Sequence, residues 1–150
     1  MTDPHARVPP RTTIAPNLVV PNGVDAIELY RAAFGAVELH RVADGGVAQL
    51  SVGGAELWIA AGESAELRRF SPASLAGRSV TMIVTVDDPD ALWERAVQAG
   101  ATPEAPMYEG HGWRLGSIID PFGHRWEIGR PLGPWPPDRR DPQHASSPGR

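Results

Sequence analysis

Apolar positions follow the period of a strand in some segments and that of a helix in others, and the order of segments occurs twice. The first half has an apolar run, a segment with apolar residues at helical spacing, and three short strand-like runs: 14–20, 25–36, 37–42, 47–52 and 56–60. The second half repeats that order: 80–86, 90–101, 102–108, 113–119 and 125–129. Each half is therefore predicted to be a βαβββ unit.

The two predicted helices carry the clearest trace of the repeat, since they align without a gap. The first begins near Asp25 and the second near Asp90, where a negative charge suits the helix dipole. Each ends at a glycine, Gly35 or Gly100, which can take the left-handed conformation that closes a helix. The pattern predicts an α+β fold of two βαβββ modules forming a half-closed, barrel-like cleft for a small molecule.

The 150 residues suit a single domain, and proline marks its ends. We expect a disordered N-terminal tail over 1–11 and a Pro-rich C-terminal tail over 131–150, in which Trp135 can dock on the body. The folded domain is predicted to span 12–130. Its modules are expected at about 12–61 and 79–130, with a linker over 62–78.

Charge and composition exclude several classes of partner. A net charge of -4 disfavours nucleic acid, which needs a basic face. No apolar run approaches the roughly 18 residues that span a membrane, and no apolar stretch follows a charged N-terminus, so a cytoplasmic location is expected. The absence of cysteine excludes disulfides and thiolate metal sites.

Three stretches of the chain carry a family likeness: the helix 26–36 (AIELYRAAFGA), the helix end 99–101, and the turn and strand 120–127 (DPFGHRWE). Together they resemble the vicinal-oxygen-chelate superfamily of glyoxalases, bleomycin-resistance proteins and dioxygenases, in its PhnB-type branch. The resemblance implies the fold above and a homodimer. It leaves function open, since the superfamily includes isomerases, lyases, dioxygenases, thiol transferases and drug-sequestering proteins.

The resemblance also implies where a metal would sit. Metal-dependent members use one side chain from the first and one from the last strand of each half, which correspond here to Ala15, Trp58, Thr81 and Glu127. A single carboxylate does not hold a transition metal, since about three protein ligands are the usual minimum. We therefore expect no metal and no cofactor, which argues against glyoxalase I and ring-cleaving dioxygenase activity.

Strand alternation predicts which side chains face the cleft. Trp58, Thr81 and Glu127 are candidates because the resemblance places them in the cleft, and alternation adds Asn17, Gln49 and Ile83. Trp113 and Arg114 complete the candidate ligand-binding residues, since the segment 108–114 carries ionisable and aromatic groups. Such a lining suits a small, partly aromatic organic ligand, with Trp58 as a stacking surface. Trp58 could instead be packed in the core, as is expected for Trp126, and Glu127 could simply pair with Arg125 or Arg114.

Two functions remain open from the sequence. The favoured one is metal-independent binding of a drug or natural product, as in antibiotic resistance by sequestration. The alternative is a metal-free isomerase, lyase or cyclase that uses Glu127 as acid or base, with His111 or Arg114 steadying charge. His111 lies in a loop between two glycines, which is typical of a cleft cover and equally of a polar surface turn.

Overall fold

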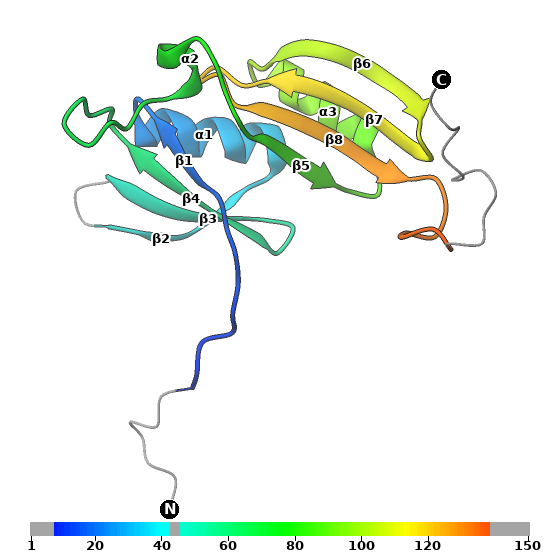
Figure 1. Ribbon diagram of the computed structural model, residues 1–150, viewed down its shortest axis with the longest axis horizontal. Helices are drawn as coiled ribbons and strands as arrows, with labels where there is room; N and C mark the ends of the chain where they lie inside the picture. Colours follow the sequence, from blue (N-terminus) through cyan, green and yellow to red (C-terminus); the bar gives the residue numbers. More distant parts are fainter. Residues whose placement is uncertain (1–7, 43–45, 139–150) are drawn as a thin grey trace, which may run out of the picture.

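The computed structural model, which describes residues 8–42 and 46–138, contains two four-stranded sheets, each backed by one long helix (Figure 1). The first half comprises β1 Asn17–Val20, α1 Gly23–Phe34, β2 Val37–Arg41, β3 Val47–Val52 and β4 Ala55–Ala61. The second comprises β5 Thr81–Thr85, α3 Pro89–Gln98, β6 Thr102–Gly110, β7 Trp113–Ile119 and β8 Arg125–Pro131. The two βαβββ modules of the predicted α+β fold are thus confirmed.

Both sheets have the same strand order, β1-β4-β3-β2 and β5-β8-β7-β6. In each, the first strand runs parallel to the last and the remaining pairs are antiparallel. The two sheets do not join into a closed barrel. Since neither described sheet has a helix on its inner face, those faces are open to ligands or to another protein surface (Figure 1).

The core lies on the helix side of each sheet and follows strand alternation. In the first sheet Leu18, Leu50 and Ile59 are at most 5% exposed, while in the second Trp126 and Ile128 are at most 2% exposed. Trp126 is thus a core residue, as expected from the sequence. The neighbours on each strand, including Trp58 and Glu127, are only partly buried and lie on the opposite face of their sheet from these core residues.

Both long helices start at polar caps and are tied to each other at one end. The Asn22 side chain accepts hydrogen bonds from the first turn of α1, and Asp88 does the same for α3. Arg95 of α3 donates from Nε to the carbonyl of Ala32 (2.6 Å) and from Nη2 to that of Arg31 (3.1 Å). A guanidinium from the second module therefore satisfies the last carbonyls of the first module's helix.

A buried carboxylate joins the modules. Asp120, 4% exposed, begins the turn between β7 and β8. Its Oδ2 accepts from the Tyr30 hydroxyl of α1 at 2.7 Å and from the Trp126 indole at 2.9 Å, and its Oδ1 accepts from the backbone amides of Phe122 and His124. Tyr30 belongs to the first module and the other partners to the second, so this carboxylate fixes one module against the other.

Several sequence predictions need correction. The strand expected from Ile14 begins only at Asn17, and Ile14 is fully exposed because the chain before it extends away from the body (Figure 1). The linker expected as a loop contains a short helix, α2 Pro72–Leu75, capped by the buried Ser71. The residues Asp44, Gly45 and Gly46 are of types that predict a tight turn between the second and third strands, and the first two of them lie outside the described residues. No helix in the described part of the chain is long and apolar enough to cross a membrane.

Tyr30 makes stability sensitive to alkaline pH. Burial, followed by the nearby charge of Asp120, raises the pKa of Tyr30 well above its ordinary value. The unfolded chain therefore releases this proton at about pH 10 while the folded chain keeps it, so the free energy of unfolding should fall as pH rises above about 10. The background is small, because the chain contains no lysine and only two tyrosines.

We predict that Tyr30→Phe lowers the free energy of unfolding by about 1–3 kcal/mol at pH 7, because Asp120 loses a buried donor. The variant should also lose much of the stability decline between pH 9 and 11. Urea denaturation across this range tests both effects. Tyr108 is kept in the variant and contributes equally to both curves, so parallel pH profiles would contradict the assignment.

Candidate functional site

The inner face of the second sheet contains a cavity of about 450 Å³. Its lining comes from all four strands of that sheet and the β6–β7 turn: Ile83, Tyr108, Gly110, His111, Trp113, Leu115, Glu127, Ile128 and Gly129. Most of these side chains are apolar or aromatic, and the ionisable ones include one carboxylate and one imidazole. This combination is typical of a pocket for a small organic molecule.

Strand register explains why these residues meet. Ile83 on β5 pairs with Glu127 on β8, and Glu127 pairs with Ser117 on β7. Two residues along, Gly129 pairs with Leu115, which pairs in turn with Tyr108 on β6. Because alternate residues share a face, the carboxylate lies at one side of an apolar and aromatic surface.

Gly129 lines the cavity without adding a side chain to it. A Cβ added there would lie 2.7 Å from the carbonyl oxygen of Arg114 and 3.1 Å from the Cβ of Leu115. The close approach of β7 and β8 therefore leaves no space for a side chain at this position.

His111 reaches the cavity from a tight hairpin turn. Gly110 pairs with Trp113, and the two residues between them, His111 and Gly112, have φ values of 53° and 77°. Two positive φ values in a two-residue loop are typical of the type I′ turns that join antiparallel strands. The turn places the imidazole in the same lining as the indole of Trp113, two residues further along the chain.

Glu127 is the carboxylate of the cavity, and its cation partner is shared. Arg125 donates from Nε to Glu104 at 2.5 Å, while its Nη1 lies 3.8 Å from a Glu127 oxygen. Glu104 also accepts from the Ser117 hydroxyl, and these hydrogen bonds, from Ser117 first and then Arg125, lower the pKa of Glu104. Arg125 is thus directed at Glu104, and Glu127 has only its longer contact.

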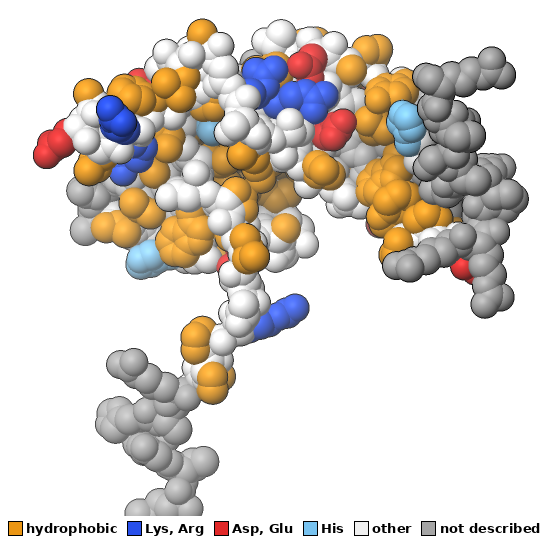
Figure 2. Space-filling model, in the orientation of Figure 1, with side chains coloured by type: hydrophobic (Ala, Val, Ile, Leu, Met, Phe, Trp, Pro, Cys, Tyr) orange, Lys and Arg blue, Asp and Glu red, His pale blue; other side chains and the backbone are white. Residues whose placement is uncertain are grey.

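The C-terminal segment adds a second indole beside the cavity. The rings of Trp113 and Trp135 are 5.1 Å apart at 75°, an edge-to-face contact. Trp135 is the residue that was expected to dock from the Pro-rich segment. Hydrophobic side chains gather over this end of the second sheet in Figure 2.

Arg114, a predicted ligand-binding residue, lies on the opposite face of β7 from Trp113. Its guanidinium makes two hydrogen bonds to Asp90 of α3, at 2.5 and 3.0 Å. This pairing lowers the pKa of Asp90 and raises that of Arg114, in each case mainly through the side-chain hydrogen bond. Neighbouring strand residues point to opposite faces, so the placement does not favour Arg114 as a ligand contact alongside Trp113.

The remaining predicted residues occupy other positions. Asn17, Trp58 and Gln49 are neighbours in register across β1, β4 and β3, on the open face of the first sheet. The amide of Gln49 donates to Glu56 on the same face at 3.0 Å. Thr81 pairs with Arg125 at the start of β5. The structure thus brings Ile83, His111, Trp113 and Glu127 into one cavity, while the first-sheet group forms a separate surface.

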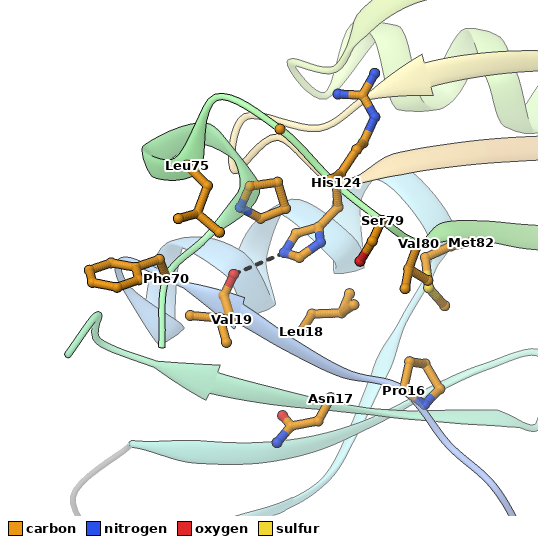
Figure 3. Close-up of a pocket in the computed structure, with 13 residues that line it drawn as sticks. Pro16, Asn17, Leu18, Val19, Phe70, Leu75, Ser79, Val80, Met82 and His124 are labelled. Carbon is orange, nitrogen blue, oxygen red and sulfur yellow. Dashed lines mark hydrogen bonds between the residues drawn. The ribbon is translucent and has the colours of Figure 1, made fainter. Parts of the chain in front are cut away.

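A second cavity, of about 390 Å³, lies between the modules where β1, the linker and β5 meet (Figure 3). Its walls are mainly apolar and include Leu18, Phe70 and Val80. The histidine in its lining, His124, already has a hydrogen-bond partner, since its Nε2 lies 2.9 Å from the carbonyl oxygen of Val19. His124 thus connects the turn before β8 to β1, across the boundary between the modules.

The four positions at which metal-dependent relatives would place ligands do not fit a divalent ion. Neither the indole of Trp58 nor the methyl group of Ala15 can coordinate a metal, which leaves one hydroxyl, Thr81, and one carboxylate, Glu127. Across the described residues, no group of three or more His, Asp or Glu side chains is arranged to hold one. The donor set gives no basis for a metal-dependent step here.

Sequence reasoning missed several residues of the cavity. Tyr108, Leu115 and Gly129 face the same side as Trp113 and Glu127, but only the register of β6, β7 and β8 shows this. Alternation along β7 could have shown that Leu115 lies on the same face as Trp113. It would also have placed Arg114 on the other face.

Two βαβββ modules, each with an open concave sheet, and a small-molecule cavity on one of them define a protein of the glyoxalase type. A family comparison agrees: residues 12–128 match the model of the Glyoxalase/Bleomycin resistance protein/Dioxygenase superfamily. The chain belongs to this superfamily.

Similar proteins cover most of the chain. An uncharacterised protein of Mycobacterium tuberculosis, Rv0887c, is 39% identical over 127 residues, covering 79% of this chain and 74% of that protein. The crystal structure of TioX from Micromonospora sp. ML1 has a TM-score of 0.62 at 28% identity, covering 81% of this chain and all of TioX. A family enzyme from Burkholderia phytofirmans has a TM-score of 0.62 at 25% identity, covering 77% and 95%.

Two tryptophans on opposite faces provide a test of the site's orientation. Trp126 contacts Phe34 at 4.7 Å and Tyr30 at 5.5 Å and is 2% exposed, so Trp126→Ala should lower the free energy of unfolding by roughly 3–5 kcal/mol. Trp58→Ala, on the open face, should cost less than half as much. Urea denaturation of both variants measures this, and the reverse order would show that the inner faces have been misassigned.

Proposed function

We propose that the protein binds a small, partly aromatic organic ligand or natural product, without a metal, in the cavity on its second sheet. The observation that supports this most is the joint placement of Trp113, Tyr108, Ile83 and Leu115 around about 450 Å³, with Glu127 at one side. Pockets of this size and composition take up much of the surface of a drug-sized molecule. Sequestration of a toxic compound, as in resistance, is the role we propose.

The proposal includes a homodimer and the PhnB-type branch of the superfamily. The face formed by Asn17, Gln49 and Trp58 carries polar and aromatic side chains but lies on the other sheet from the cavity. In a homodimer, that face of one protomer can cover the cavity of its partner. Asn17, Gln49, Trp58 and Thr81 would then contribute to binding, with Trp58 as the stacking surface.

A metal-free isomerase, lyase or cyclase is the second candidate. It is favoured by the presence of Glu127 and His111, a carboxylate and an imidazole, in one lining. Glu127 would move a proton to or from the ligand, and His111 would steady developing charge. Sequestration needs neither step, so the two functions differ in what the removal of the carboxylate does.

Native mass spectrometry of protein taken directly from its producing cell tests three parts of the proposal together. We expect a mass of twice 16.1 kDa, a retained small molecule, and no divalent ion. A stoichiometric zinc, iron or manganese ion that is removed by EDTA with a fall in melting temperature would contradict the metal-free proposal. A monomeric mass at micromolar concentration would contradict the dimer.

Variants of the cavity test its use. Trp113→Ala should weaken binding of 2-naphthylmethanol, a neutral aromatic probe, at least tenfold by calorimetry, because the ligand loses an aromatic wall. Leu67→Ala, at an exposed linker position, is the control and should leave affinity unchanged. Glu127→Gln should keep binding of this neutral probe within about twofold. Conversion of an added metabolite by the wild type, lost in Glu127→Gln, would instead favour the enzyme.

A further inference from the structure

The cavity on the second sheet has an uneven distribution of charge. Its lining includes the carboxylate of Glu127 and the imidazole of His111, and it contains neither arginine nor lysine. The guanidinium nearest to that carboxylate, Arg125, donates at 2.5 Å to Glu104 and reaches Glu127 only at 3.8 Å. A contact of 3.8 Å is too long for a hydrogen bond, so the carboxylate keeps free acceptor positions.

The aromatic rings in the lining reinforce this charge. Tyr108 and Trp113 line the cavity together, and Trp113 is supported by the edge-to-face contact with Trp135. The faces of aromatic rings carry partial negative charge, and they attract a cation placed within about 6 Å. A carboxylate beside two such rings is complementary to an organic ammonium group.

The surroundings at the same end of the sheet are also acidic. On the other face, a shallow depression is lined by Asp87, Asp88, Asp90 and Glu109, with Arg114 and Arg130 as its cations. Four carboxylates against two guanidinium groups leave a negative local field, and the whole chain carries a net charge of -4. A field of this sign attracts cations to the cavity and repels anions.

We propose that the cavity selects organic cations: molecules with an aromatic or apolar body and a protonated or quaternary amine. The amine lies against Glu127 and the faces of Trp113 and Tyr108, and the apolar body covers Ile83 and Leu115. Carboxylates, phosphates and phosphonates are disfavoured, because they meet the charge of Glu127 and the lining offers them the imidazole of His111 but no arginine or lysine. This inference rests on the proposed function and adds the class of ligand to it.

Three naphthalene probes with the same apolar body test the selectivity. They are 2-naphthylmethyl-trimethylammonium, 2-naphthylmethanol and 2-naphthylacetate, which differ in the charge of the side group. Calorimetry should give the cation at least tenfold higher affinity than the alcohol, and the acetate should show no binding. Affinity for the cation should fall as salt concentration rises, while that for the alcohol should not.

Two glutamate variants then assign the effect to the cavity. Glu127→Gln should reduce affinity for the cation at least tenfold and leave the alcohol within about twofold. Glu66→Gln removes the same charge from an exposed linker position and should change neither. Equal affinity of the wild type for all three probes, or an unchanged preference for the cation in Glu127→Gln, would overturn the inference and leave the binding function standing.

Absence of binding by every probe would overturn both the inference and the proposed function. Circular dichroism and melting temperature, matched between wild type and Glu127→Gln, would show that a lost affinity reflects the missing charge. The substitution keeps the size of the side chain, and Glu127 is partly exposed, so the fold should be retained.

Discussion

The arrangement of the two halves depends on the hydrogen bonds that the carboxylate of Asp120 accepts from both of them. This carboxylate is buried, and it accepts hydrogen bonds from Tyr30 of the first module, from Trp126 of the second, and from two amides of its own turn. A buried charge is costly unless its acceptor positions are filled, so the hydrogen bond from the Tyr30 hydroxyl favours the observed orientation of the modules. The ring contacts of Tyr30, Phe34 and Trp126 enclose the same point.

The contacts between the modules determine which face of each sheet is left uncovered. Asp120 and the Arg95 contacts hold α1 and α3 against each other on the core side. Each helix covers the core side of its own sheet, so the inner faces are left without a partner within the described chain. The open faces are therefore a consequence of how the core is satisfied.

Much of the fold was readable from the sequence because periodicity and repetition are local signals. The order of elements and the helix starts near Asp25 and Asp90 follow from spacing alone, and the core position of Trp126 follows once the resemblance places its neighbour Glu127 in the cleft. The late start of β1 could not be predicted, because Ile14 looks like a strand residue and only the pairing of Asn17 with Trp58 shows where the ladder begins. Likewise, α2 has too few residues to show a period.

The site was only partly readable, and the reason is physical. Alternation pointed to Ile83, the resemblance to Glu127 and the segment 108–114 to Trp113. None of these signals could say that the three residues form a cavity separate from Asn17, Gln49 and Trp58, since that depends on how the modules are joined. Arg114 was grouped with its sequence neighbour Trp113 because both carry binding chemistry. Its ion pair with Asp90 involves a residue 24 positions away, which no local pattern indicates.

The repeat places different side chains, an indole and a carboxylate, at equivalent positions of the two modules. Trp58 and Glu127 occupy matching places, each on the last strand of its module beside the first strand, with Asn17 and Ile83 as the corresponding partners. In the first module an indole has an amide on either side, and in the second a carboxylate has an aliphatic residue on one side and a hydroxyl on the other. The backbone places Trp58 and Glu127 at equivalent positions of the two sheets. Whether a face suits stacking on a ring or attraction of a charge depends on which side chain occupies that position. By its chemistry, the indole of the first face suits an aromatic ring, and the carboxylate of the second face suits a cation.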